Sequence, residues 1–195
     1  MDLAPLRGIL PAHCLLSEPE DTRPFECDGL TLIRQPPPVV ALPETFEQLV
    51  ALLRHCHAHA IPVVPRGAGT GLAGSATPLA DGVLLSMAKF NRIVKLDVES
   101  RTAVVEPGVR NLAISDAARP FGLYYAPDPS SQIACSIGGN VSENSGGVHC
   151  LKYGLTLPNV LGVKALLADG EEVEFGGAAL DSPGLDLLAV LVGSE

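Results

Sequence analysis

Apolar residues recur along the first half of the chain in short runs whose period predicts alternating helices and strands. A short helix is expected over residues 1–10, and Val39–Ala41 is expected to form a buried strand. A longer helix is expected over about 43–60, because its apolar residues have helical spacing. Val63–Val64 and Val83–Leu85 then predict two further buried strands, which gives a β-α-β unit with mostly parallel pairing.

The second half of the chain changes to alternating apolar and polar positions, which are typical of antiparallel strands. Ile93–Asp97 and Thr102–Glu106 predict one hairpin, followed by a helix over Val109–Pro120. Val160–Leu167 and Glu172–Phe175 predict a second hairpin around an Asp-Gly turn. The change in pairing predicts an α+β protein of two lobes.

A run of three consecutive prolines separates an arm from a domain. Residues 1–34 are expected to form an N-terminal arm that is mostly irregular after its first helix. The domain is expected over residues 35–195, with lobe one over about 35–90 and lobe two over about 91–195. Asp186–Val192 predicts a short helix or strand, after which the chain stops without a terminating element. The domain is therefore expected to be truncated at its C-terminus.

The composition describes a globular protein with few means of binding nucleic acid. Of the 195 residues, 47% are hydrophobic and 18% are charged, which suits a protein with a real core. Aromatic residues make up 4% of the chain and the formal net charge is −9, so base stacking and phosphate-backbone binding are both disfavoured. No apolar run approaches the ~20 residues of a membrane span. We therefore expect no nucleic-acid partner and no integral membrane segment.

Cysteine and histidine usage predicts a reduced protein without a metal site. The five cysteines are an odd number without a C-x-x-C pair, which predicts neither a disulfide framework nor a zinc ribbon and fits the cytoplasm. His55 and His59 share a helix face, but His57 does not, and no carboxylate is near them in sequence. Histidines in a last helical turn also complement the helix dipole.

The glycine-rich segment Ile61–Ser75 carries the most chemistry in the first lobe. Its four glycines allow positive φ and close backbone approach, and successive free amides in such a turn form a concavity for anions. Arg66 is expected at the mouth of this turn as a bidentate phosphate donor, and Thr70 adds a hydroxyl. The segment predicts diphosphate binding, with an ordinary surface turn as the alternative.

The pattern G-x-G-x-x-G at Gly69–Gly74 also requires a Rossmann site to be considered. Such a site opens a helix, whereas Pro78 and Gly82 interrupt the residues that follow here, which have no helical period. A Walker A motif fails too, because no Gly-Lys-Ser/Thr follows the glycines. A phosphate loop of a different kind is therefore predicted.

A second segment, Pro127–Gly147, is dense in small residues, hydroxyls and carboxamides. Its paired glycines allow close backbone approach. Side chains able to donate to ring heteroatoms or ribityl oxygens are Ser131, Ser136, Asn140, Ser142 and Asn144. A long exposed loop is the alternative, although unstructured loops of this length are uncommon in compact domains unless they are functional.

Four motifs make the sequence resemble a known family: Pro65–Gly74, Pro127–Ser131, Ser136–Gly147 and Lys152–Gly154. With their spacing they cover roughly residues 35–195. The sequence resembles the FAD-linked oxidases that share the FAD-binding domain of vanillyl-alcohol oxidase and p-cresol methylhydroxylase. Within them it is similar to the group of glycolate oxidase FAD subunits and D-lactate and D-2-hydroxyacid dehydrogenases. The resemblance implies a two-lobed α+β domain of the p-cresol methylhydroxylase type, with a small β-α-β lobe and an antiparallel lobe.

By this resemblance the first loop contacts the pyrophosphate of FAD, the second segment lies along the flavin, and Val105–Val109 approaches the adenosine half. The implied cofactor-binding residues are Pro65, Arg66, Gly67, Ala68, Gly69, Thr70, Gly71, Leu72, Gly74, Pro107, Gly108, Pro127, Asp128, Ser131, Ser136, Gly138, Gly139, Asn140, Ser142, Asn144 and Gly147. FAD is expected to be non-covalent, because Thr70 stands where some relatives tether FAD through a histidine. Cys135 and Cys150 are interpreted as small buried hydrophobes.

The resemblance implies a flavin-dependent oxidoreductase that passes hydride from the α-carbon of a small 2-hydroxyacid to the flavin. Electrons would then reach a partner subunit or a quinone, and the chain would lie at the inner membrane only through such a partner. The substrate groups are implied to lie largely in a C-terminal domain beyond this chain, so these residues alone are expected to be inactive. Two alternatives stay open: a flavoprotein similar to UDP-N-acetylmuramate reductase that uses NADPH, and a non-catalytic nucleotide-binding module.

Overall fold

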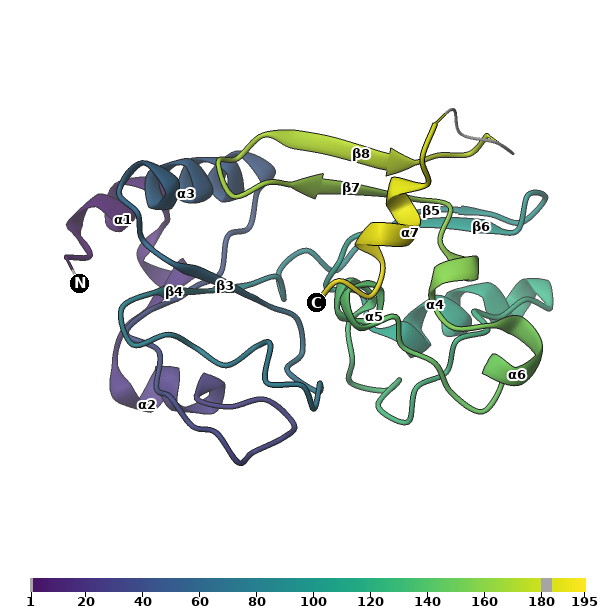
Figure 1. Cartoon of the computed structure of the whole chain (residues 1–195), viewed down its shortest axis with the longest axis horizontal. Helices are drawn as coiled ribbons and strands as arrows, with labels where there is room; N and C mark the ends of the chain where they lie inside the picture. Colours follow the sequence, from purple (N-terminus) through teal and green to yellow (C-terminus); the bar gives the residue numbers. More distant parts are fainter. Residues whose placement is uncertain (1, 180–183) are drawn as a thin grey trace. The chain divides into compact units, whose positions relative to one another are not determined.

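The computed structural model describes residues 2–179 and 184–195, which divide into two compact units. The first unit contains the residues up to Phe90 together with Leu166–Glu171. The second contains Asn91–Ala165 and Glu172–Glu195. The strands of the described residues form three separate sheets rather than one, and helices occur in both units, as expected of an α+β protein (Figure 1).

A four-stranded sheet forms the centre of the first unit. Its strands lie in the order β1 (Leu15–Leu16), β2 (Val40–Ala41), β4 (Val83–Ser86) and β3 (Val63–Arg66). Strands β2 and β3 both pair with β4 in parallel, which confirms the predicted β-α-β unit. Strand β1 pairs with β2 antiparallel and was not predicted.

Two helices cover this sheet with an apolar face. Helix α3 (Phe46–Ala58) begins where the Thr45 hydroxyl accepts a hydrogen bond from the amide of Gln48 at 3.3 Å, the usual role of a threonine N-cap. Helix α1 (Ala4–Ile9) lies beside α3 (Figure 1). The core between helices and sheet buries Leu6, Leu10, Leu52 and Val83 to 1% exposure or less, which commits the start of the chain to the first unit.

The segment expected to be mostly irregular contains several short elements. The 3₁₀ turn η1 (Ala12–Cys14) leads into β1, and helix α2 (Pro19–Thr22) is followed by the 3₁₀ turn η2 (Arg23–Phe25). Cys14 is fully buried in the core of the unit. Elements of two to four residues carry too little periodic pattern to be recognised in the sequence.

The second unit begins with the predicted hairpin of β5 (Ile93–Asp97) and β6 (Thr102–Val105), which are antiparallel with one irregularity between Ile93 and Lys95. Helix α4 (Asn111–Ala118) and the 3₁₀ turn η3 (Arg119–Phe121) follow. A small core of Val109, Ile114 and Ile137 holds the hairpin, α4 and the next helix together.

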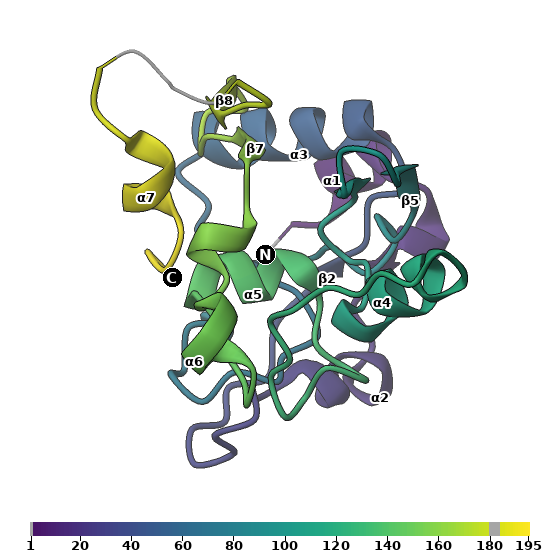
Figure 2. The same ribbon diagram turned by 90° about the vertical axis from the view of Figure 1, so that its right-hand side faces the viewer.

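The remaining elements of the second unit are helix α5 (Ile137–Glu143), helix α6 (Cys150–Tyr153), the 3₁₀ turn η4 (Leu157–Asn159) and a second hairpin. That hairpin joins β7 (Gly162–Leu166) to β8 (Glu172–Gly176), as predicted, and helix α7 (Leu187–Leu191) packs against β8 (Figure 2). Helices α5 and α6 were not predicted. None of the helices within the described residues is long and apolar enough to cross a membrane.

Candidate cofactor-binding site

In the first unit, the glycine-rich loop follows directly from the end of β3. Within the described residues, the backbone amides of residues 68–73 donate no hydrogen bond. Gly69 has a φ of +69°, which residues with a Cβ rarely adopt. A series of unpaired amides in a bent segment is the arrangement that binds anionic groups elsewhere in proteins.

The structure corrects the expected position of Arg66. Its side chain does not stand at the mouth of the loop but is 8% exposed, and its Nη1 donates to the Ala76 carbonyl at 3.3 Å. The guanidinium also lies 5.7 Å from the ring centre of Phe25. A Cβ added at Gly69 would come 2.1 Å from Arg66 Nη2, so the loop folds directly over this side chain. Arg66 therefore supports the loop from inside the unit.

Two residues of the N-terminal segment hold the loop and were missed by the sequence analysis. Asp28 is 5% exposed, and its Oδ2 accepts a hydrogen bond from the amide of Gly74 at 2.8 Å. A Cβ on the next residue, Gly29, would lie 2.8 Å from the carbonyl oxygen of Thr70. No local pattern marks either residue, because their contacts are with residues more than forty positions later.

The other predicted residues of this loop differ in exposure. Ala68 and Leu72 are exposed, with Leu72 at 70%, and Pro65 is exposed at the edge of the sheet. The half-buried residues are Gly67, Gly69, Thr70, Gly71 and Gly74. The loop thus presents backbone and the apolar side chains of Ala68, Leu72 and Ala73 to solvent, rather than charged side chains.

In the second unit, the structure brings Pro107 and Gly108 next to the segment that contains Gly138. The amide of Gly138 donates to the Pro107 carbonyl at 2.8 Å, and the amide of Ile137 donates to the Val109 carbonyl at 2.8 Å. A Cβ at Gly138 would lie 2.8 Å from the Pro107 Cβ. Two stretches that the sequence analysis assigned to one cofactor are therefore neighbours, and Gly138 is required by the contact between them.

A buried carboxamide network joins this segment to Pro127. Asn111 Nδ2 donates to the Pro127 carbonyl at 3.0 Å and to Asn140 Oδ1 at 2.9 Å. Asn140 is 3% exposed and its Nδ2 donates to Cys135 Sγ at 3.3 Å. Asn140 was predicted as a donor to the flavin, but in the structure its carboxamide is buried and forms hydrogen bonds with Asn111 and Cys135.

Asp128 and Gly147 meet at the far end of the same segment. The amide and the Nδ1 of His149 lie 3.2 Å from Asp128 Oδ1 and 2.6 Å from Asp128 Oδ2 respectively. Burial raises the pKa of Asp128, but the hydrogen bonds from His149 outweigh it and lower the pKa overall. A Cβ at Gly147 would come 2.1 Å from the Asp128 carbonyl oxygen, so this glycine too is required by contact with protein.

The remaining predicted residues of the second unit lie on or beside α5. Ser142 Oγ donates to the Gly138 carbonyl at 3.2 Å, and Asn144 ends the helix with a φ of +49° while its Oδ1 accepts from the Leu157 amide at 2.9 Å. Ser131 is half-buried and its carbonyl accepts from the Cys135 amide at 2.8 Å. Gly139 is half-buried, and a Cβ added there would lie 3.4 Å from Ser136 Oγ.

Each unit contains polar groups that fit part of FAD. The unpaired amides of residues 68–73 match the acceptor oxygens of a pyrophosphate. In the second unit, Ser136 is 5% exposed and its Oγ has no hydrogen-bond partner among the described residues, which is unusual for a buried hydroxyl. Three buried hydroxyls among the described residues have no partner, those of Thr77, Tyr125 and Ser136, and Ser136 is the one that the sequence predicts as a cofactor donor. Backbone amides and this hydroxyl thus form the donor set of the fit, and charged side chains do not contribute to it.

Residues 37–176 match the family of FAD binding domains. Over 193 residues, the chain is 57% identical to the glycolate oxidase subunit GlcD of Escherichia coli, covering 99% of this chain and 39% of that protein. It is 40% identical over 158 residues to the D-lactate dehydrogenase of Archaeoglobus fulgidus, covering 80% of this chain and 35% of that protein. The chain thus spans about two fifths of the length of these curated relatives.

The fold matches that of p-cresol methylhydroxylase with a TM-score of 0.77 at 23% identity, over 96% of this chain and 39% of that structure. The resemblance in the motifs and the likeness in fold therefore agree. The p-cresol methylhydroxylase type of FAD-binding domain, expected from the sequence, is confirmed.

Proposed function

Because the chain belongs to the family of FAD binding domains, we propose that it is the FAD-binding part of a flavin-dependent 2-hydroxyacid oxidoreductase. The observation that carries this proposal is the 57% identity with a glycolate oxidase subunit across 193 residues. A D-lactate dehydrogenase at 40% identity supports the same substrate class, small 2-hydroxyacids.

In this proposal the loop after β3 binds the pyrophosphate of FAD through the amides of residues 68–73. Asp28 and Arg66 hold that loop in shape from below rather than touching the phosphates. Because the loop surface has no charged side chains, the backbone amides are the main source of donors. The positive φ of Gly69, which sets the direction of these amides, is therefore more important for FAD binding than any one side chain.

The second unit supplies groups for the flavin and adenosine parts of FAD. Ser136 Oγ is the group that we assign to a polar atom of the cofactor, because it is buried and has no protein partner among the described residues. The carbonyl groups of Pro107 and Val109 fix the start of α5 beside it by accepting from the amides of Gly138 and Ile137. Asn111 and Asn140 position the segment around Pro127 without reaching the cofactor.

Bound FAD would supply the hydride-accepting chemistry, and the residues of this chain bind and orient it. The Escherichia coli relative is named as a subunit of glycolate oxidase. We therefore include in the proposal a partner subunit or a quinone outside this chain as the electron acceptor.

A domain exchange tests the proposed function directly. Residues 1–195 of this chain would replace the matching 193 residues of Escherichia coli GlcD, and glycolate-dependent bleaching of the flavin would be followed in the purified chimera without oxygen. We expect FAD to bind and to be reduced by glycolate but not by NADPH. A folded, FAD-loaded chimera that NADPH reduces and glycolate does not would contradict the proposal.

A binding experiment on the chain itself tests the pyrophosphate assignment. The apo chain would be titrated with FAD and, in parallel, with FMN, which lacks the second phosphate and the adenosine. We expect FAD to bind at least about a hundredfold more tightly, because two or more charge-assisted hydrogen bonds of roughly 1.5–3 kcal/mol each are lost with FMN. Equal affinities for FAD and FMN would refute the assignment.

A further inference from the structure

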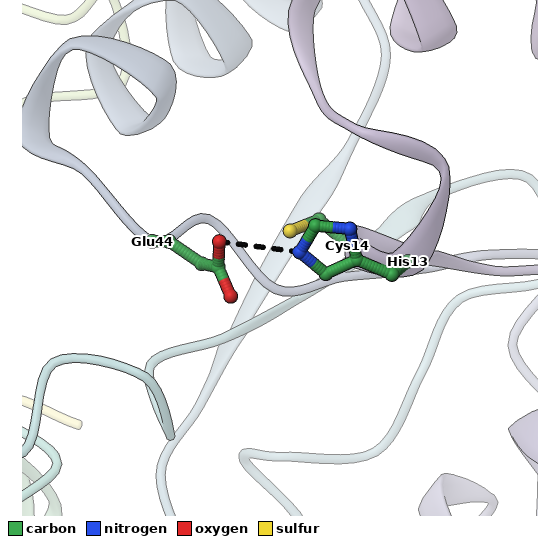
Figure 3. Close-up of side chains that lie close together, drawn as sticks. All are labelled: His13, Cys14 and Glu44. Atoms are coloured by element: carbon green, nitrogen blue, oxygen red, sulfur yellow. Dashed lines mark hydrogen bonds and ion pairs between the residues drawn. The ribbon is translucent and has the colours of Figure 1, made fainter.

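We propose that His13, Cys14 and Glu44 form a three-ligand site for a divalent cation of the zinc type in the first unit. Figure 3 shows the imidazole, the thiol and the carboxylate facing one another. They come from the 3₁₀ turn η1 and from the residue just before the N-cap of α3. One nitrogen, one sulfur and one oxygen ligand are a set that zinc accepts in proteins.

The distances suit such an ion. His13 Nε2, Cys14 Sγ and a Glu44 carboxylate oxygen all lie within 4.8 Å of one another, and His13 Nε2 is 3.2 Å from Glu44 Oε2. In a tetrahedral zinc site with bonds of 2.0–2.3 Å, neighbouring ligand atoms are separated by about 3.4–3.6 Å. The distance between His13 Nε2 and Glu44 Oε2 is therefore already close to its length in such a site, and the Cys14 sulfur, within 4.8 Å of a ligand atom of each, would move closer by at most about 1.4 Å.

The backbone holds these residues in place without an ion. The amide of Leu42 donates to the Cys14 carbonyl at 2.8 Å, which ties the segment of η1 to the strand that leads towards Glu44. The amide of Glu44 donates to Gln48 Oε1 at 2.8 Å, so its backbone is fixed against the first turn of α3. Cys14 is fully buried, whereas His13 and Glu44 are exposed, so the sulfur lies at the base of a site that opens to solvent.

The charges around the cluster are compatible with a cation. Lys89 Nζ lies 3.2 Å from Glu44 Oε1, which leaves Oε2 to the ion and gives the ligating carboxylate the outer partner that such ligands usually have. On binding, the Cys14 thiol would release its proton to solvent and form the sulfur–metal bond. The thiolate and the carboxylate then supply two negative charges against the two of the ion and the one of the Lys89 ammonium, and no oxidation or reduction occurs.

The donor set also decides which ions the site would select. Thiolate and imidazole favour zinc and other transition metals over magnesium and calcium, which prefer oxygen ligands. Three protein ligands leave a fourth position for water. Among the described residues no other trio of histidine, cysteine and acidic side chains has its ligand atoms this close, and that includes the group around His55 and His59.

The test uses cobalt(II) as a spectroscopic substitute for zinc in the purified apo chain. We expect one equivalent to give thiolate-to-cobalt charge-transfer absorption together with the visible bands of four-coordinate cobalt, and zinc to displace it. His13→Gln, Cys14→Ser and Glu44→Gln should each lower the affinity at least about tenfold to a hundredfold, since even outer-shell partners have effects of that size. His13 is exposed, so its variant tests the site without disturbing the core.

Matched controls are Cys27→Ser and His57→Gln, which remove a partly buried cysteine and an exposed histidine of the same unit outside the cluster. Both should bind cobalt as the unmodified chain does. The proposal is wrong if the unmodified chain shows no thiolate–cobalt absorption, or if the spectrum survives in His13→Gln and Cys14→Ser. It is also wrong if the spectrum is lost in Cys27→Ser. None of these outcomes depends on flavin binding.

Discussion

Asp28 Oδ2 accepts a hydrogen bond of 2.8 Å from the backbone amide of Gly74, which is 46 residues further along the chain. The other oxygen of the same carboxylate accepts from the amide of Leu30 at 2.9 Å. Asp28 therefore joins a turn of the N-terminal segment to the far end of the glycine-rich loop. The shape of a loop proposed to bind FAD depends on a residue that lies outside every motif of the sequence.

We predict that Asp28→Ala weakens FAD binding by about tenfold to a hundredfold, the equivalent of one charge-assisted hydrogen bond of roughly 1.5–3 kcal/mol. Asp28→Asn keeps one acceptor oxygen but places an NH2 group against the amide of either Gly74 or Leu30, so its affinity should lie between those of the unmodified chain and Asp28→Ala. Fluorescence titration with FAD measures both. Asp21→Ala, an exposed acid on α2, is the control. An unchanged affinity in Asp28→Ala would disprove the role.

We predict that Gly69→Ala lowers FAD affinity at least about tenfold. The left-handed backbone costs a residue with a Cβ about 1–2 kcal/mol, and the new Cβ would meet Arg66 Nη2 at 2.1 Å. Gly8→Ala in α1, where a Cβ meets nothing within 4 Å, is the control and should leave affinity unchanged. The double variant Arg66→Ala/Gly69→Ala should lose less than the sum of the two single losses, because the clash is gone.

We predict that Asn111→Ala lowers the free energy of unfolding by about 1–3 kcal/mol, because it leaves the carbonyl of Pro127 and the Oδ1 of Asn140 buried without their donor. Asn111→Asp keeps the shape but places an acceptor against two acceptors, so it should be at least as destabilising. Urea unfolding of the apo chain measures both effects. If Asn111→Asp were as stable as the unmodified chain, the network would not have the energetic role given to it here.

The pH dependence of stability should carry the signature of Tyr125. Burial raises its pKa from 10.0 to about 12, with the Thr156 hydroxyl opposing and Cys135 adding to the shift. As the pH rises, the unfolded chain therefore loses the phenol proton before the folded chain does. The contribution of Tyr125 to the free energy of unfolding is fully present below pH ~10 and falls as the pH rises to ~12. The loss is roughly 2–3 kcal/mol, at 1.36 kcal/mol per pH unit. Tyr125→Phe should lack this component. If the free energies of unfolding of the two proteins, measured with urea, changed equally with pH across that range, the prediction would be contradicted.

The regular elements were predictable because their apolar residues repeat with a clear period. Helix α3 and the parallel strands β2, β3 and β4 follow from local pattern alone, and so do both hairpins. Helix α5 was not predicted, because two glycines and a serine in its short sequence are typical of loops and only the contacts with Pro107 and Val109 fix it as a helix.

The candidate site was predictable as a set of segments but not as a set of roles. Glycines at 138 and 147 were interpreted as making room for a ligand, whereas in the structure they make room for Pro107 and Asp128. Asp28 and the cluster of His13, Cys14 and Glu44 join residues that are distant in sequence and share no motif. Such pairings depend on tertiary packing, which a single sequence does not display.

FAD should be released from the protein by acid, because no side chain of the loop is suited to a covalent bond with the flavin. Thr70 has a hydroxyl and no ring nitrogen or sulfur that could bond to the flavin. Cys135 is 3% exposed and lies against Asn140, which makes its sulfur part of the interior. Cys150 is half-buried beside Gly146.

Precipitation of the FAD-loaded chain with trichloroacetic acid should therefore leave all flavin absorbance in the supernatant. Cys150→Ser, the matched control for a thioether bond, should behave in the same way, whereas yellow pellets from the unmodified chain and colourless ones from Cys150→Ser would show that the flavin is attached at that sulfur.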